Sequence, residues 1–258
     1  MTESNSGLPD QNKKIEAKES KGYPQEFFDI QIKLARKLSS ISGRHLGDVL
    51  IKNTNLYKRL GCVGKPDPSD PLWQEFISGI QEQDLTDYTY QFYLRFKDRK
   101  IEADKDRLTF GCFRYDYDPD SKIVRIHFGN RQASGSPLDN PEERRQELRN
   151  MFEYIKKNHS DAQEVKGGSW LYNLKKYRDI FPPEYTSNLV EYDSKYAGFS
   201  IWGQFLDRDT NIKPEKIKEF LASLDRAKNE KEILQSFPLH PLSAGTNIEN
   251  FYRDLGIK

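Results

Sequence analysis

The sequence predicts an α+β fold, in which a mixed sheet of about four strands packs with helices beside an all-helical N-terminal layer. Apolar residues recur at helical spacing through residues 24–100. Two runs rich in β-branched and aromatic residues follow Arg107 and are joined by a turn. Helix-like and strand-like segments then alternate to the end of the chain. We therefore expect a single α+β domain over 24–258, with a helical layer at 24–100 and a sheet-containing part at 101–258.

The N-terminal layer is expected to consist of helices. The first three are predicted at 24–43, at 45–60 and from Asp70 onward, where Asp70 and Pro71 suit the N-cap and the first helical position. Residues 84–98 are ambiguous. The spacing of Tyr88, Phe92 and Phe96 fits a helix, whereas the aromatic content fits a strand, and we choose the helix.

The sheet-containing part begins with a hairpin. Val124, Ile126 and Phe128 alternate with polar residues, which is typical of a half-buried strand. The predicted strands are 108–117, 122–130, 162–167 and 198–207. Helices are predicted from 140, 170 and 214, near 230–236, and after a capping box formed by Thr246 and Glu249. Residues 237–245 have no regular pattern.

The composition supports one large domain and limits the partners. The chain has 258 residues, and 12% of them are aromatic, so relatively few side chains can bury a large area. The 41 basic and 40 acidic residues give a formal net charge of +1. Nucleic-acid binding usually requires a basic excess, so we expect no nucleic-acid partner.

Cysteine usage and hydropathy point to a soluble, cytoplasmic protein. The two cysteines, Cys62 and Cys112, are too few for a disulfide framework and lack the spacing of a zinc site. No run of about 18 apolar residues can span a membrane. The first residues lack the apolar stretch of a secretory signal. Residues 1–23 hold few aliphatic side chains and are expected to form a disordered tail.

The sharpest candidate for a ligand site is the glycine pair that follows the strand at 162–167. Gly167 and Gly168 allow a ligand to approach the backbone closely, and Ser169 opens the next predicted helix. A helix N-terminus attracts anions, and Lys166 adds a positive charge beside it. The sequence therefore predicts an anion-binding corner, although a tight turn with Ser169 as an ordinary N-cap is the alternative.

Two further candidates lie on predicted strands. Arg125 and His127 are two residues apart, so they point to the same face and can clamp an anion while the imidazole transfers a proton. Trp202 and Gln204 share a face of the strand expected at 198–207, where an indole beside an amide suits a flat polar ligand. For both pairs a purely structural role is the alternative. Asp116, Asp118 and Asp120 start like a calcium loop but lack its glycine and closing glutamate, so no metal site is expected.

Four segments of the chain resemble a widespread family of uncharacterised bacterial proteins. They are RIHFGN (125–130), SPLDNPEERRQEL (136–148), GGSWLYNLKKYRDIFPPEY (167–185) and FSIWGQFLDR (199–208). The similarity covers most of residues 27–256 and implies no reaction, cofactor or substrate. The strand, glycine and helix layout is also similar to that of acyl-CoA-dependent N-acetyltransferases, whose glycine signature the chain does not match.

These observations favour an enzyme that transfers or hydrolyses an acyl or phosphoryl group on a small anionic metabolite. The alternative is a non-enzymatic protein-interaction module with an aromatic-rich binding surface. Convergence of Arg125, His127 and Ser169 on one pocket would favour the enzyme, and an exposed aromatic patch would favour the module. The sequence indicates no cofactor, substrate or oligomeric state.

Overall fold

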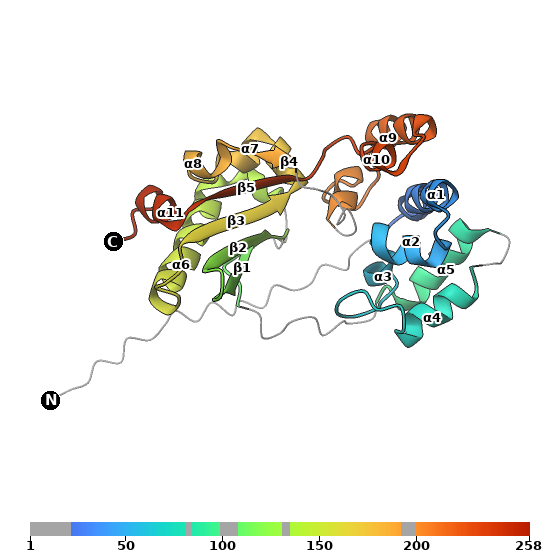
Figure 1. The fold of residues 1–258 in the computed structure, drawn as a ribbon, viewed down its shortest axis with the longest axis horizontal. Helices are drawn as coiled ribbons and strands as arrows, with labels where there is room; N and C mark the ends of the chain where they lie inside the picture. The colour runs from blue at the N-terminus through green and yellow to red at the C-terminus, as the bar shows by residue number, and fades with distance from the viewer. Residues whose placement is uncertain (1–21, 81–83, 99–107, 131–134, 192–199) are drawn as a thin grey trace.

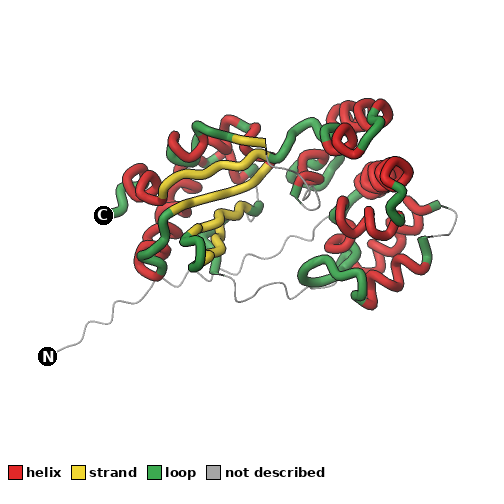
Figure 2. Tube along the Cα trace, in the orientation of Figure 1, coloured by secondary structure: helices red, strands yellow, loops and turns green. Residues whose placement is uncertain are grey.

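A computed structural model of the chain describes residues 22–80, 84–98, 108–130, 135–191 and 200–258. It confirms the α+β fold (Figure 1). Figure 2 shows one part built of helices alone and another that combines a sheet with helices, and the described residues of each part form an apolar core of their own. The predicted tail falls on residues 1–21, which lie outside the described ranges, and on Gly22 and Tyr23, which pack on the helical core. The backbone N–H of Tyr23 donates to the Tyr93 hydroxyl at 2.9 Å.

The sheet has five strands in the described part of the chain, one more than predicted. They are β1 (Phe113–Asp118), β2 (Ile123–Phe128), β3 (Glu164–Ser169), β4 (Val190–Glu191) and β5 (Leu242–Asn247). The order across the sheet is β1-β2-β3-β5-β4, and only β2 and β3 are parallel. A parallel pair needs a crossover connection, and helix α6 (Pro141–Asn158) provides it.

One face of the sheet is buried by helices. Val124, Val165 and Ala244 point toward this side and are almost inaccessible to solvent. The helices on this side are α6, α7 (Lys175–Arg178), α8 (Pro183–Thr186) and α11 (Ile248–Asp254), with the short 3-10 helices η1 (Pro137–Asp139) and η2 (Trp170–Asn173). The opposite face carries charged side chains, and Asp116, Arg125 and Lys166 are exposed on it. A half-covered sheet of this kind leaves one face free for a site.

The helical part draws on two separate stretches of the chain. Its first helices are α1 (Gln25–Ser42), α2 (Leu46–Asn53), α3 (Leu56–Arg59), α4 (Pro71–Ser78) and α5 (Leu85–Phe96). The second stretch contributes η3 (Ile201–Phe205), α9 (Pro214–Arg226) and α10 (Glu230–Leu234), and its apolar residues belong to the same core (Figure 1). The chain therefore leaves the sheet before residue 201 and returns to it after Phe237. No helix in the described ranges is long and apolar enough to cross a membrane.

The ambiguous segment 84–98 is a helix because its start is capped. The Asp84 carboxylate accepts hydrogen bonds from the backbone N–H of Thr86 at 2.9 Å and of Asp87 at 3.2 Å. These contacts satisfy two amides that a helix leaves unpaired. The helical spacing then places Phe92 and Tyr93 in the core.

The strand expected at 198–207 is wrong, because residues 201–205 form the 3-10 helix η3. Ile201, Trp202, Gln204 and Phe205 are all buried, whereas a strand would bury alternate residues. The Gln204 side-chain amide donates to the carbonyl oxygen of Ile201 at 3.0 Å, which fixes the turn locally. Residues 198 and 199 lie outside the described ranges.

Three other boundaries differ from the prediction. The helix expected from 170 to 181 divides into η2 and α7, because Leu174 has an extended backbone. The helix expected at 45–60 divides at Thr54, whose hydroxyl donates to the Leu50 carbonyl oxygen. Residues 242–247, which have no strand pattern, form β5, because they are paired with β3 and β4 on either side. As a result Asn247, not Thr246, caps the last helix.

Candidate active site

The two parallel strands of the sheet separate at their carboxyl ends. The ladder between β2 and β3 runs from Ile123–Glu164 to Arg125–Lys166 and ends there. Each strand nevertheless continues, β2 in register with β1 and β3 in register with β5. Ligands of open α/β sheets commonly bind beyond the carboxyl ends of parallel strands. We therefore expect a ligand site at this split.

A hollow of about 400 Å³ lies at the split. Six of the eight predicted site residues line it together: Arg125, His127, Lys166, Gly167, Gly168 and Ser169. Ser200, Ile201, Pro241 and Ser243 complete the lining, together with Ile126. The residues come from β2, β3, β5 and the two places where the chain passes between the sheet and the helical part. The hollow has the size of a small-molecule site.

His127 is held by a carboxylate across the hairpin. Its Nε2 lies 2.7 Å from Oδ2 of Asp116. The β1–β2 register places Asp116 opposite Arg125, so the contact with His127 is diagonal, and both side chains lie on the open face. When Nε2 donates to Asp116, Nδ1 is the ring nitrogen that can accept a proton from a ligand. An imidazole oriented by a carboxylate is a common arrangement for proton transfer.

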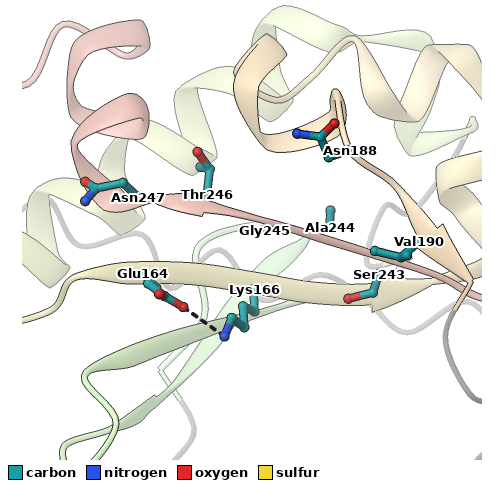
Figure 3. Close-up of a pocket in the computed structure, with 9 residues that line it drawn as sticks. All are labelled: Glu164, Lys166, Asn188, Val190, Ser243, Ala244, Gly245, Thr246 and Asn247. Carbon is teal, nitrogen blue, oxygen red and sulfur yellow. Dashed lines mark ion pairs between the residues drawn. The ribbon is translucent and has the colours of Figure 1, made fainter.

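Two positive side chains line the hollow, one from β2 and one from β3. Arg125 is exposed and makes no ion pair with any described residue. Lys166 pairs with Glu164 at 2.8 Å on the open face (Figure 3). An exposed ion pair contributes little to stability, so an anionic ligand can compete for the ammonium group. A neighbouring hollow of about 430 Å³ shares Lys166 and Ser243 and extends along β5 to Asn188 (Figure 3).

The glycine pair is part of a strand and does not form the predicted corner. Gly167 and Gly168 lie within β3, opposite Ala244 and Ser243 of β5. The Ser169 hydroxyl caps η2 by accepting from the backbone N–H of Leu171 at 3.1 Å, but this 3-10 helix has only four residues. A helix of that length has almost no dipole. Any attraction for an anion must therefore come from Arg125 and Lys166.

Gly167 is required by the tyrosines behind the sheet. A Cβ on this residue would lie 2.6 Å from the Tyr172 hydroxyl oxygen and still closer to that of Tyr185. The two hydroxyls are hydrogen-bonded to each other at 2.8 Å in the buried core. Burial also raises the pKa of the Tyr172 hydroxyl above its ordinary value, so it stays protonated near neutral pH.

We expect Gly167→Ala to destabilise the protein by about 1–3 kcal/mol, because the added methyl group overpacks this cluster. The measurement is urea unfolding, and the matched control is Gly245→Ala, where the nearest atoms would lie 3.5 Å away. Tyr185→Phe removes the closest oxygen and should restore part of the stability in the Gly167→Ala background. Equal stability of the two glycine variants would contradict the packing argument.

Trp202 and Gln204 are not part of the hollow. Trp202 is completely buried in the helical core, where its ring contacts those of Phe205 and Phe237. The Gln204 side chain accepts from the backbone N–H of Leu239 at 2.9 Å. Both residues are therefore structural, because neither faces a solvent-accessible cavity at the split.

The sequence reasoning missed Asp116, Ser200 and Ser243. Asp116 was considered only as a calcium ligand, yet the hairpin register was sufficient to place it beside His127. The turn at 118–121 fixes that register from the sequence. Ser243 had no such signal because β5 was not predicted, and Ser200 fell in the strand expected at 198–207, where the structure has the start of η3.

Another hollow, of about 530 Å³ and called the second hollow from here on, adjoins the first and shares Ile126, His127, Gly168, Ser169 and Ser200 with it. It extends toward the start of β1 and toward η2 and α7, with Cys112, Arg114, Phe128, Gly129, Tyr172 and Tyr177 in its lining. His127 therefore stands between two connected cavities.

No family model, curated protein or solved structure matches the chain. Within the described ranges, no group of three or more His, Cys, Asp and Glu side chains is placed to hold a metal ion. The function of the chain must therefore be inferred from the residues of the two hollows that His127 lines.

Proposed function

We propose that the chain is an enzyme that transfers an acyl group from an anionic thioester, such as an acyl derivative of coenzyme A. The observation that carries the proposal is the split between β2 and β3, at which Arg125, Lys166 and the His127–Asp116 pair meet around one hollow. The similarity in layout to acyl-CoA-dependent N-acetyltransferases adds support by analogy alone.

The split suits the extended arm of such a donor. Two strands that separate while staying paired on their outer sides turn backbone polar groups toward each other with no strand between them. An extended chain that carries amide groups can enter there and form strand-like hydrogen bonds. The pantetheine arm of coenzyme A is a chain of this kind, and it ends in the thioester. The phosphates at its other end would meet Arg125 and Lys166.

The charges and the imidazole suit acyl transfer. A nucleophile must lose a proton as it attacks the thioester carbonyl carbon, and His127 can accept that proton through Nδ1. Asp116 would stabilise the imidazolium that results, as carboxylates do beside catalytic histidines.

The interaction-module alternative has less support. The large hydrophobic residues exposed in the described ranges are few, and each comes from a different segment of the chain: Val63, Leu94, Leu108, Tyr154 and Val190. A protein-binding surface usually presents a contiguous apolar patch. Most aromatic side chains instead pack with one another in the two cores.

Acetyl-coenzyme A should raise the melting temperature of the protein, by the equivalent of roughly 2.7 kcal/mol at about 100 times its dissociation constant. Arg125→Ala should abolish most of this shift. It should leave the empty protein unchanged, because Arg125 is exposed and has no ion-pair partner among the described residues. Arg149→Ala, which removes an exposed arginine from α6, is the control. No shift with acetyl-coenzyme A, or an equal shift with ADP alone, would contradict an acyl-coenzyme A site.

His127→Gln should lower the rate of acyl transfer by about 100-fold or more, because the proton acceptor is lost. Release of free thiol from acetyl-coenzyme A measures the rate with an amine acceptor. The thermal shift with acetyl-coenzyme A should persist in this variant. Asp116→Asn should reduce the rate less, because it removes only the group that orients the ring. An unchanged rate in His127→Gln would exclude His127 as the base.

A further inference from the structure

The second hollow contains a cation, Arg114, that is not paired with any residue in the described part of the chain. Arg114 is half-buried in its lining and makes no ion pair or side-chain hydrogen bond with any residue of the described ranges. The β1–β2 register places it directly opposite His127, so the two side chains are close neighbours on the open face. No carboxylate of the described residues lines this cavity, so the guanidinium is well suited to bind a carboxylate from a ligand.

Three aromatic residues, Phe128, Tyr172 and Tyr177, form one part of the lining of the same cavity. The rings of Phe128 and Tyr177 lie with their centroids 5.1 Å apart, and those of Tyr172 and Tyr177 lie 5.2 Å apart. Burial raises the pKa of the Tyr177 hydroxyl well above its ordinary value, so this wall is uncharged near neutral pH. Such a wall favours an apolar group.

The order of charged side chains along β1 suits a ligand that carries both a carboxylate and an ammonium group. Arg114 and Asp116 are two residues apart on one strand, so they project from the same face about 6–7 Å apart. Arg114 would face a carboxylate, and Asp116, which lies outside the lining but holds His127 within it, would attract an ammonium group. The imidazole therefore lies where the nitrogen of such a ligand would be placed.

We infer that the second hollow binds the acyl acceptor, and that this acceptor is an apolar amino acid held through its carboxylate by Arg114. This inference rests on the proposed acyl transfer for its chemistry, but not for the binding itself. The ammonium group of the amino acid loses a proton to Nδ1 of His127, and its nitrogen forms a bond to the thioester carbonyl carbon. The carbon–sulfur bond then breaks, with its electron pair on sulfur, and the second amine proton converts the thiolate into a thiol. The products are an N-acyl amino acid, free coenzyme A and one proton.

The binding test uses thermal shift with apolar L-amino acids, each beside its carboxamide, with and without acetyl-coenzyme A. At least one of L-phenylalanine, L-leucine, L-isoleucine, L-valine and L-methionine should stabilise the wild type, and its carboxamide should not. Arg114→Gln should abolish that shift and keep the shift with acetyl-coenzyme A. Arg114→Lys should restore part of it, because the charge remains. Absence of a shift with every amino acid, or equal shifts with the carboxamides, would overturn the inference.

The activity test compares L-phenylalanine with phenethylamine, which lacks the carboxylate. The lost charged hydrogen bonds correspond to roughly a 10- to 100-fold lower kcat/KM for phenethylamine. Arg114→Gln should lower kcat/KM for L-phenylalanine by the same factor and leave that for phenethylamine unchanged. An equal loss on both substrates would overturn the role of Arg114. If acetyl-coenzyme A does not bind, the proposed function is wrong. The thermal shifts with amino acids then still show whether the second hollow binds an amino acid through Arg114.

Discussion

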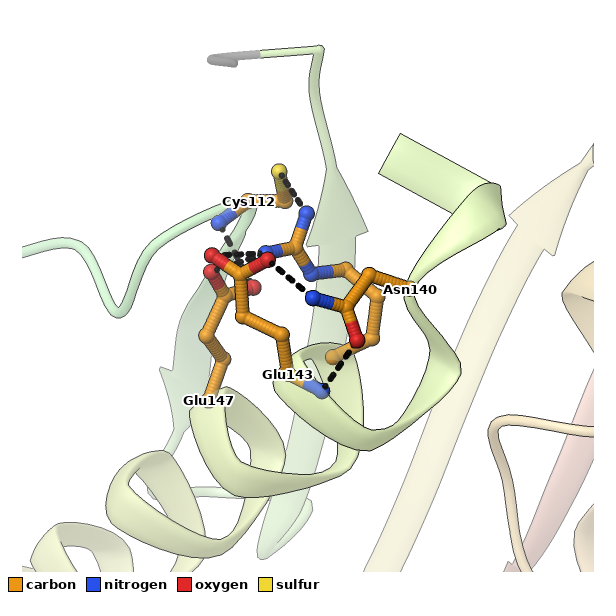
Figure 4. A network of polar contacts seen from close by, with 5 residues as sticks. Cys112, Asn140, Glu143 and Glu147 are labelled. Carbon is orange, nitrogen blue, oxygen red and sulfur yellow. Dashed lines mark hydrogen bonds and ion pairs between the residues drawn. The ribbon is translucent and has the colours of Figure 1, made fainter. Parts of the chain in front are cut away.

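Arg144→Ala is expected to destabilise the protein by about 3–5 kcal/mol, because it removes one partner of a buried ionic network. The Arg144 side chain is fully buried in α6, and its guanidinium lies 2.7 Å from Glu143 and 2.8 Å from Glu147 (Figure 4). It also donates to the Cys112 sulfur at 3.2 Å, just before β1. Glu147 in turn accepts from the backbone N–H of Cys112 at 3.0 Å. The network thus fastens the crossover helix to the edge strand.

The loss of stability in Arg144→Ala should depend on pH. Burial raises the pKa of the Glu147 carboxyl above its ordinary value, and the nearby Arg144 charge opposes that rise. Without Arg144 this pKa rises further, so the folded state holds the proton more tightly than the unfolded state does. A carboxyl with a raised folded-state pKa makes stability fall as the pH rises through that range. The deficit of Arg144→Ala should therefore be smaller near about pH 4 than near about pH 7.

Urea unfolding at both pH values measures the deficit, with Arg149→Ala as the control on the same helix. Arg149 pairs with Glu153 at 3.0 Å and is exposed, so its loss should cost about 0.5 kcal/mol or less. Combining Arg144→Ala with Glu147→Gln should recover part of the stability, because the more buried of the two carboxylates that Arg144 neutralises is then also removed. A deficit near that of Arg149→Ala would show that the network adds nothing.

Sequence patterns predicted the elements whose own residues determine them. The helix at 84–98 follows from the Asp84 cap and the helical spacing of its aromatic residues. In contrast, β5 was missed because residues 242–247 contain small and polar side chains with little strand propensity. Its conformation depends on β3 and β4, which pair with it on both sides. The segment 201–205 was misassigned for the opposite reason, since its consecutive apolar residues fit a buried strand as well as a buried helix.

For the candidate site, too, the sequence predicts some features and not others. The period of a strand places Arg125 and His127 on one face, and this needs no knowledge of the fold. Bringing Lys166 beside Arg125 depends on the parallel pairing of β2 and β3 across α6, which local residues do not specify. Ser169 was expected to present a helix N-terminus, but the extended backbone of Leu174 prevents a long helix there. The same residues therefore meet at one hollow for a reason different from the predicted one.

The second large loss of stability is expected from a change in residues 201–237, which contribute to the core of the helical part. Phe220 in α9 is completely buried, with its ring centroid 5.1 Å from that of Phe205 and 5.1 Å from that of Phe237. Helix α9 also packs on α1, from the other stretch of the same core. We expect Phe220→Ala to cost about 3–5 kcal/mol through the cavity that it leaves.

Hydrogen exchange can test whether that cost is shared across the two stretches. Because both contribute to one core, amides in α1 and α5 should exchange faster in Phe220→Ala, along with those in α9 and α10. Amides in β1 and β2 should change little, because they belong to the other core. Leu221→Ala is the matched control, since Leu221 is the next residue of α9 but is only partly buried, and its effect should be smaller. Faster exchange confined to residues 201–237 would show that this segment folds independently of α1 and α5.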